Sequence, residues 1–240
     1  MSDTQVYKGE VMTKFSFEVP LKHLEDFHDE QDFIFALSFL FGNPRYDHYI
    51  HNQDKELWID NSYNETKEPG DVEYLAELAD IFTPNILIAP DTAEWNHQKM
   101  QDEYLNLRII SGLDDSRLSI IIHHPDWIGY YKSWGIKNFC IPYDYRYCTL
   151  EKLRRFSECH FLGLVSINEI LYSNPPSCDT SMPIKLSLIK WDLDKWIKEG
   201  CPHIHTSKTF FDCVLTQKEL LLAKSNIRRL KELCQEKSSS

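Results

Sequence analysis

The chain has 240 residues, of which 42% are hydrophobic and 26% are charged, so it is neither intrinsically disordered nor collagen-like nor a coiled coil. Its 37 acidic and 26 basic residues give a net charge of −11, which excludes a general polyanion binder but not a nucleic-acid enzyme with a local basic patch. No apolar run reaches the ~18 residues of a membrane span, and the polar N-terminus does not resemble a secretory signal. The 7 cysteines include no C-x-x-C pair, so we expect no disulfide framework and a cytoplasmic protein.

Short apolar runs alternate with longer amphipathic stretches along the chain. They predict eight strands, of which the last is the weakest: residues 14–19, 33–40, 57–59, 86–89, 118–122, 138–141, 161–165 and 176–179. Apolar runs of this length are typical of strands buried on both faces, as in parallel sheets. We predict a single domain over residues 1–235 and a disordered tail over residues 236–240.

Helices are predicted between these runs, at residues 71–82, 91–107, 127–134, 149–157 and 216–234. A capping box of Thr216 and Glu219 opens the last of them. Strands that alternate with helices indicate a parallel sheet, and about eight of them indicate a (β/α)₈ TIM-like barrel. A doubly wound open sheet is the alternative. The sequence lacks the glycine-rich motifs of nucleotide-binding folds, and we predict no cofactor.

Several apolar runs end on or near an aspartate: Asp60, Asp91, Asp126, Asp144 and Asp179. In a barrel, the carboxyl ends of the strands form one face, and the loops on that face build the active site. Carboxylates crowded at one mouth repel each other unless cations, hydrogen bonds or protonation offset the repulsion. The pattern therefore indicates a functional site.

A purely structural explanation of these aspartates remains open, because an aspartate between a strand and a helix is an ordinary N-cap. Asp91 precedes Glu94 by three residues, as in a capping box, whereas Asp126 and Asp144 have the setting of turn residues. Asp60 and Asp179 lie in polar segments that this explanation fits less well.

Five segments resemble the tRNA-guanine transglycosylase superfamily, most closely its phage DpdA-like branch, which places 7-deazaguanines into DNA. They are LWIDNSYNE at 57–65, NILIAPDTAEWNHQ at 85–98, GIKNFCIPYD at 135–144, HFLGLVSINE at 160–169 and SCDTSMPIKL at 177–186. The resemblance covers about residues 30–235. It implies a (β/α)₈ barrel that exchanges a guanine base through a covalent aspartate intermediate.

The resemblance also implies roles for individual residues. Asp179 matches the nucleophile, Asp60 matches the general acid/base, and Asp91 matches the aspartate that reads the purine edge. The further positions implied to contact the base are Asn61, Ser62, His123, His124 and Gly163. We expect Asp179 to be held ionised by hydroxyl groups, which the sequence offers at Ser177, Thr180 and Ser181.

Three departures from the family pattern bear on the site. The loop of Ser62, Tyr63 and Asn64 is bulkier than the family's glycine-rich loop. The tRNA enzymes carry a Cys₃His zinc site, whereas the comparable residues here, Cys201, His203, His205 and Cys213, have a different spacing, so we predict no metal. FDCVLT at 211–216 resembles a nucleophile motif, but Asp212 precedes the final helix, so Asp179 is preferred.

Aromatic residues near the predicted mouth could stack on an extruded base, although rim packing explains them as well: Tyr63, Trp95, Trp127, Tyr143 and Tyr145. Basic residues at Arg146, 152–155 and 224–231 could contact phosphates or form solvated helix faces. The sequence shows no appended RNA-binding module. This favours DNA over tRNA as the polymer, or a partner protein that binds the nucleic acid.

The first hypothesis is therefore a transglycosylase that exchanges guanine for a 7-deazaguanine in nucleic acid, with phage DNA and the host cytoplasm as its setting. A catalytically silent barrel that serves as a binding subunit is the second. A metal-dependent hydrolase that uses the carboxylates with His123, His124, His203 or His205 is the third.

Overall fold

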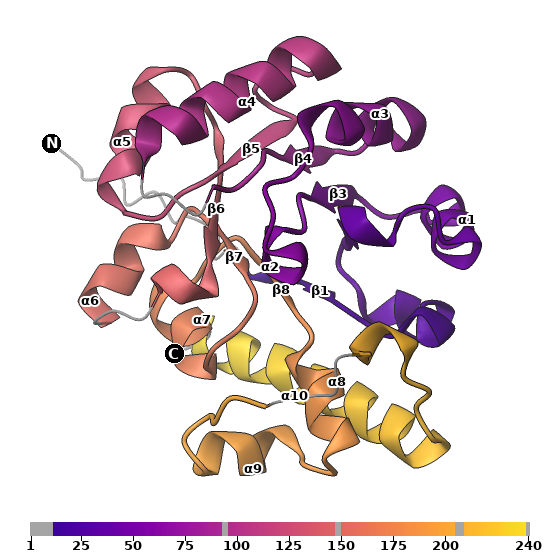
Figure 1. The fold of residues 1–240 in the computed structure, drawn as a ribbon. Helices are drawn as coiled ribbons and strands as arrows, with labels where there is room; N and C mark the ends of the chain where they lie inside the picture. The colour runs from indigo at the N-terminus through magenta and orange to yellow at the C-terminus, as the bar shows by residue number, and fades with distance from the viewer. Residues whose placement is uncertain (1–11, 93–95, 147–149, 205–208, 239–240) are drawn as a thin grey trace, which may run out of the picture.

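The computed structural model describes residues 12–92, 96–146, 150–204 and 209–238. Eight parallel strands form one nearly closed barrel, hydrogen-bonded in the order β1-β8-β7-β6-β5-β4-β3-β2 (Figure 1). Their bounds are β1 Lys14–Phe17, β2 Ile34–Leu37, β3 Leu57–Asp60, β4 Ile86–Ile88, β5 Leu118–Ile121, β6 Asn138–Pro142, β7 His160–Leu162 and β8 Ser177–Thr180. Each predicted strand is present, and the (β/α)₈ barrel is confirmed rather than the open sheet.

Helices surround the strands (Figure 1). Their bounds are α1 Pro44–Asn52, α2 Tyr63–Thr66, α3 Val72–Phe82, α4 His97–Ser111, α5 Asp126–Ser133, α6 Leu150–Leu153, α7 Ile167–Ser173, α8 Met182–Leu188, α9 Leu193–Lys198 and α10 Gln217–Ser238. Short 3₁₀ helices include Tyr143–Tyr145, Arg154–Phe156 and Phe210–Asp212. No helix among the described residues is long and apolar enough to cross a membrane.

The predicted boundaries that differ most from the structure are those of α4 and α10. Helix α4 begins at His97 rather than at residue 91, because Asn96 is its N-cap and accepts hydrogen bonds from the amides of Gln98 and Lys99. Asp91 is therefore not a helix cap, and Glu94 lies outside the described residues. At the other end of the chain, α10 continues to Ser238, so residues 236–238 are helical instead of disordered.

Side chains close the seam between β1 and β2, where no strand ladder forms. The Ser16 hydroxyl accepts a hydrogen bond from the Phe35 amide at 3.0 Å. The buried Gln31 side chain accepts from the Phe17 amide at 2.5 Å and donates to the Phe17 carbonyl at 2.8 Å. These bonds replace the backbone partners that β1 lacks on this edge.

We expect Gln31→Leu to lower the free energy of unfolding by about 2–4 kcal/mol, because it leaves both backbone groups of Phe17 buried without that partner. Urea unfolding measures the change. The matched control is Gln98→Leu on the exposed face of α4, which should change stability by less than about 0.5 kcal/mol. Equal losses in the two variants would contradict this account of the seam.

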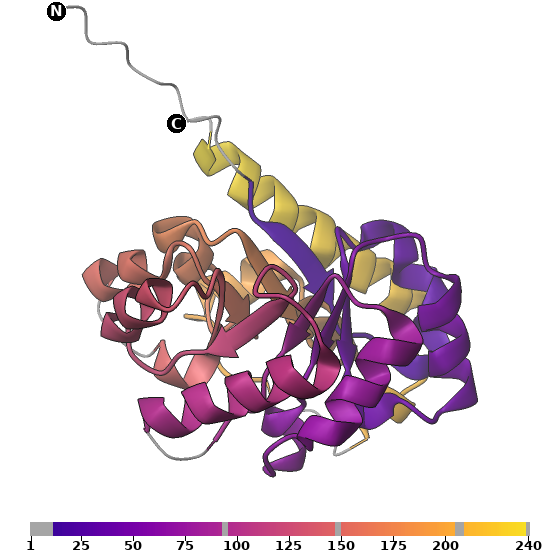
Figure 2. The ribbon, with the colours of Figure 1, turned by 90° about the horizontal axis from the view of Figure 1, so that it is seen from above.

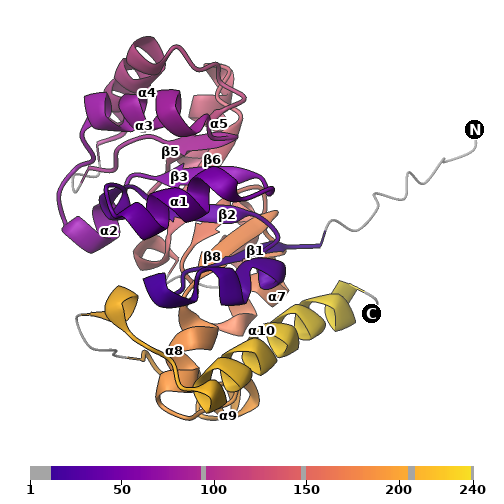
Figure 3. The same ribbon diagram turned by 90° about the vertical axis from the view of Figure 1, so that its right-hand side faces the viewer.

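The C-terminal helix α10 packs along the barrel next to its first and last strands. Figures 2 and 3 show it lying across the side of β1 and β8, together with α8. Lys231 donates to Asp32 at 2.7 Å, and Lys224 pairs with Glu30 at 3.2 Å. Helix α10 therefore fixes the start of the barrel through residues about 200 positions away in the sequence.

Candidate functional site

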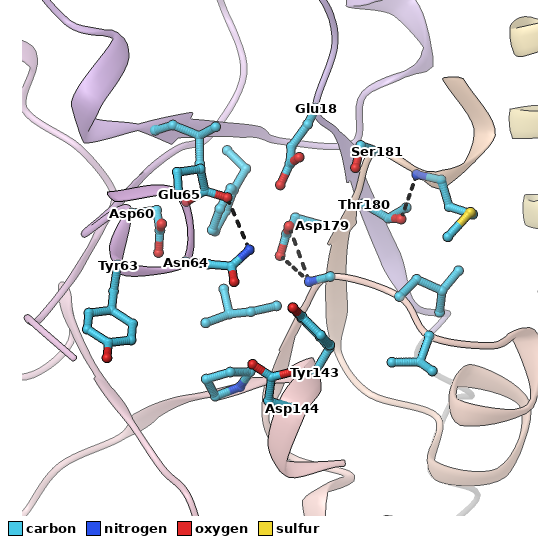
Figure 4. A pocket seen from close by; sticks show the side chains of 18 of the residues that line it. Glu18, Asp60, Tyr63, Asn64, Glu65, Tyr143, Asp144, Asp179, Thr180 and Ser181 are labelled. Atoms are coloured by element: carbon cyan, nitrogen blue, oxygen red, sulfur yellow. Dashed lines mark hydrogen bonds between the residues drawn. The ribbon is translucent and has the colours of Figure 1, made fainter. Parts of the chain in front are cut away.

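A cavity of about 470 Å³ opens at the carboxyl ends of the strands. Residues from β2, β3, β5, β6, β7 and β8, the segment after β1 and the loops that follow the strands line it (Figure 4). Six carboxyl groups belong to its described lining: Glu18, Asp60, Glu65, Asp91, Asp144 and Asp179. Lys67 and Lys185 supply positive charge there. The cavity thus joins four of the five predicted aspartates in one acidic site.

Asp179 lies on the inner face of β8 and is only 2% exposed. Its carboxylate accepts hydrogen bonds from the Gly163 amide at 3.2 and 3.3 Å. Gly163 has φ = +72°, a conformation that favours glycine and that aims its N–H at Asp179. Burial raises the pKa of Asp179 to about 6, and the Gly163 hydrogen bond opposes this rise. At neutral pH the carboxylate is therefore mostly ionised.

His160 on β7 contacts the Asp179 carboxylate, although the sequence analysis did not select it. Its Nε2 lies 3.1 Å from Asp179 Oδ1, and its Nδ1 lies 2.8 Å from the Ser177 hydroxyl. Burial, and then the charge of Arg146, lower the pKa of His160 to about 3, so the ring is neutral. A carboxylate needs a donor, so we assign the proton to Nε2 and the Ser177 hydroxyl as donor to Nδ1.

The hydroxyl groups expected to hold Asp179 have other contacts. Ser177 binds His160, and Thr180 Oγ1 accepts from the Met182 amide at 3.0 Å. Ser181 interacts with Glu18 instead. The prediction was wrong about the donors. Thr180 points to the opposite face of β8, and Ser177 shares the face of Asp179 but meets His160 of the neighbouring strand β7, which itself contacts Asp179.

Asp60 ends β3 and reaches into the same cavity (Figure 4). Burial, and then the charge of Glu65, raise its pKa well above the usual value, which favours its protonated form. Asn61 also lines the cavity, where its amide donates to the Ala89 carbonyl at 2.6 Å. Ser62 is not among the residues that line the cavity: its φ is +58°, and its hydroxyl accepts from Ser38 at 2.9 Å.

Asp91 follows β4 and contributes to the cavity wall. Its Oδ1 lies 2.8 Å from His123 Nε2, and the His123 ring stacks on Tyr145 with centroids 4.0 Å apart. His123 is buried and lies behind Asp91, outside the cavity lining. Asp91, rather than His123, is therefore the group of this pair that can meet a ligand.

His124 and Asp126 lie away from the cavity on the surface, where they form an ion pair at 3.3 Å. Asp126 is the first residue of α5 and also pairs with Arg155. Asp144 remains at the mouth, in the 3₁₀ helix Tyr143–Tyr145. Asp126 therefore has a structural role at the start of α5 and does not belong to the candidate site.

Arg146 is buried, so it is neither a solvated surface residue nor a phosphate contact. Its guanidinium binds Glu169 Oε2 at 3.1 and 3.2 Å and donates to the carbonyls of Ile141, Leu162 and Gly163. It also lies 4.5 Å from the centre of the Phe161 ring. Arg146 ties the carboxyl ends of β6 and β7 together and holds the loop that presents the Gly163 amide.

The other basic and aromatic candidates are divided between the site and the surface. Tyr63, Tyr143 and Tyr145 line the cavity, Trp127 does not, and Trp95 lies outside the described residues. Arg155, Lys224, Arg229 and Lys231 pair with carboxylates of the chain itself. These four basic residues thus have intramolecular partners in this structure.

Cys201 and His203 line the cavity, whereas Cys213 donates to the Thr209 carbonyl and His205 lies outside the described residues. Within the described ranges, no three His, Cys, Asp or Glu side chains are grouped to hold a metal ion. Asp212, the rival nucleophile, is exposed in the 3₁₀ helix Phe210–Asp212 and is not part of the cavity lining.

Glu18 and Glu65 belong to the acidic site, and sequence reasoning did not select them. Glu18 follows β1, and its carboxyl faces that of Asp179 (Figure 4). Glu65 lies on α2 at the cavity mouth, where Asn64 donates to it at 3.3 Å. Desolvation of the Glu65 carboxyl, and then the charge of Glu18, raise its pKa. The side chain as a whole is exposed, so solvent screens both effects. Glu18 ended no apolar run before a helix, so the strand-end pattern passed over it.

No protein-family model matches this chain, and no curated protein sequence matches it either.

Proposed function

We propose that the protein is a transglycosylase that exchanges guanine for a 7-deazaguanine base in nucleic acid, with DNA favoured over tRNA. One observation carries the proposal: the buried, ionised Asp179 stands in a cavity at the carboxyl face of a (β/α)₈ barrel, held by Gly163 and His160. Fixed donors keep a nucleophile in one orientation, which favours attack on a sugar carbon. The resemblance of five sequence segments to the tRNA-guanine transglycosylases supports the same reaction.

In the first step, an Asp179 oxygen attacks C1′ of the nucleoside as the bond from C1′ to guanine N9 breaks. Guanine leaves with the bonding electron pair and takes a proton from Asp60. Asp60 suits this role because burial raises its pKa well above the usual value and so favours the protonated form that a general acid needs. In the second step, the 7-deazaguanine returns a proton to Asp60 and attacks C1′, which releases the Asp179 carboxylate.

The cavity wall supports recognition of a guanine-like base. Guanine presents N–H donors on its Watson–Crick edge, and the wall offers the carboxylates of Asp91 and Asp144 as acceptors. Tyr143 and Tyr145 offer rings on which a base could stack. His123 acts through Asp91, which it orients. We assign no base contact to Ser62 or His124, because neither lines the cavity.

The acidic wall also constrains how a polymer could bind. Phosphates are repelled by those of the six carboxyl groups that are ionised, so the sugar and base must enter the cavity while the neighbouring phosphates stay at its rim. Lys67 and Lys185 are the lysines that line the described part of the cavity. A partner protein with a basic surface would strengthen binding of the polymer, in keeping with the net charge of −11.

Base exchange in the two polymers tests the proposal. The purified protein is incubated with guanine-containing duplex DNA or with tRNA and a mixture of 7-deazaguanines, and the nucleosides are analysed by mass spectrometry. We expect a 7-deazaguanine nucleoside in the DNA. Its appearance in tRNA alone would correct the polymer, and its absence from both would overturn the proposal in favour of a silent binding subunit.

A further inference from the structure

Glu18 is placed next to Asp179 by the pairing of β1 with β8. In that register Ser16 lies opposite Asp179, and the Glu18 amide donates to the Thr180 carbonyl at 3.3 Å. Alternate residues of a strand share a face, so Glu18 follows Ser16 on the inner side of the barrel. Its carboxyl points toward the Asp179 carboxyl (Figure 4). Hydrogen bonding with Asp179 raises the pKa of Glu18, and hydrogen bonding with Ser181 lowers it.

Two carboxyl groups in hydrogen-bonding contact do not both ionise readily, so the pair holds one proton near neutral pH. Asp179 has the Gly163 amide, His160 and the nearby charge of Arg146 to stabilise its ionised form. Glu18 has Ser181 and the charge of Lys185. The stronger set of donors is at Asp179, and the proton therefore resides on Glu18.

The other titratable groups around Glu18 favour the same arrangement. The carboxyl groups of Asp60 from β3 and Glu65 from α2 also lie near Glu18, and any of them that ionises opposes ionisation of Glu18, while Tyr46 from α1 also faces it. Lys185 from α8 is the cation that acts against them. Burial, followed by the charge of Asp179, raises the pKa of Glu18 to about 8.

We propose that Glu18 carries the proton of this pair and, by donating a hydrogen bond through it to Asp179, keeps Asp179 an ionised and oriented nucleophile. Glu18 is then a positioning residue that acts through Asp179, and no proton leaves it when the Asp179 oxygen bonds to C1′. The role in base exchange rests on the proposed function. The shared proton itself does not, and it is measurable without substrate.

The substrate-free test compares wild type with Glu18→Gln and with Glu56→Gln, whose exposed carboxylate pairs with Lys14 at the other end of the barrel. We expect the protonated-carboxyl band of the infrared spectrum at pH 7 to be weaker by one carboxyl group in Glu18→Gln than in wild type, and to be unchanged in Glu56→Gln. Because the pKa of Glu18 rises from 4.5 to about 8 on folding, its stabilising effect is complete below pH 4.5 and is lost as the pH rises to about 8. The melting temperature of Glu18→Gln should therefore fall less across this range than that of wild type.

The proposal would be overturned if wild type and Glu18→Gln had identical infrared spectra and the same dependence of melting temperature on pH, whether or not the protein exchanges bases. Glu18→Leu is the companion variant, since it removes both the charge and the donor. Its Asp179 should have a higher pKa than in wild type, measurable by carbon NMR of labelled aspartate. An unchanged Asp179 pKa in Glu18→Leu would also contradict the shared proton.

The activity test uses the pH profile of base exchange. In wild type we expect the rate to fall below about pH 6 as Asp179 is protonated, and above about pH 8 as Glu18 ionises and repels it. Glu18→Gln keeps a neutral donor and should lose only the alkaline decline. Glu18→Leu should shift the acid decline to higher pH. An alkaline decline that persists in Glu18→Gln would show that Glu18 does not set it.

Discussion

Asp179→Asn is expected to reduce base exchange by at least about 10³-fold, because an amide cannot form the covalent bond to C1′. The variant should keep its fold, since the Asn carbonyl can still accept from the Gly163 amide. Exchange is measured by mass spectrometry of the nucleosides, and folding by the melting temperature. Without an acceptor base, wild type should form a protein–DNA adduct on a denaturing gel, and Asp179→Asn should form none.

Asp212→Asn is the matched control for the nucleophile. Asp212 lies in the FDCVLT segment, which resembles a nucleophile motif, but it is exposed and does not line the cavity. We expect its activity and its adduct to equal those of wild type. If Asp212→Asn lost exchange while Asp179→Asn kept it, the nucleophile would have to be reassigned.

Arg146→Met is expected to lower the free energy of unfolding by about 3–5 kcal/mol, although the substitution keeps an unbranched apolar stem. The change leaves the Glu169 carboxylate, whose side chain is 6% exposed, without its ion pair. It also removes the donor to three backbone carbonyls at the ends of β6 and β7. Denaturant unfolding followed by tryptophan fluorescence measures the loss.

Two further variants distinguish a buried ion pair from a general effect of losing an arginine. Arg155→Met removes an exposed pair with Asp126 and should cost less than about 1 kcal/mol. Adding Glu169→Leu to Arg146→Met removes the stranded carboxylate and should restore part of the stability. Equal losses for Arg146→Met and Arg155→Met would show that burial of the Arg146 network contributes little.

The strand pattern was predictable where a strand is apolar on both faces. Residues 118–122, for example, which contain β5, are all buried, and only a sheet covered on both sides accommodates such a run. Helices with weak local patterns were not predicted. Helix α8, Met182–Leu188, contains a proline and several buried residues all around its axis, so it lacks the polar face of an amphipathic helix.

The candidate site was predictable where a residue ends a strand. Asp60, Asp91, Asp144 and Asp179 reach the cavity, because parallel strands bring their carboxyl ends to one face. Asp126 follows the same pattern but begins α5, where it pairs with Arg155. The position after a strand thus predicts proximity to the mouth, and the geometry of the following loop decides whether a side chain turns into it.

The sequence by itself determined the alternation of strands and helices, and with it the barrel and the face that carries the aspartates, because hydrophobic periodicity is a local property of the chain. Only the tertiary structure decided the partners of Asp179. Gly163 and His160 come from β7 and its loop, Glu18 follows β1, and Arg146 acts from beyond β6. These contacts join residues that lie 16 to 161 positions away from Asp179, where charge, burial and hydrogen bonding depend on strand order and register, which no local pattern encodes.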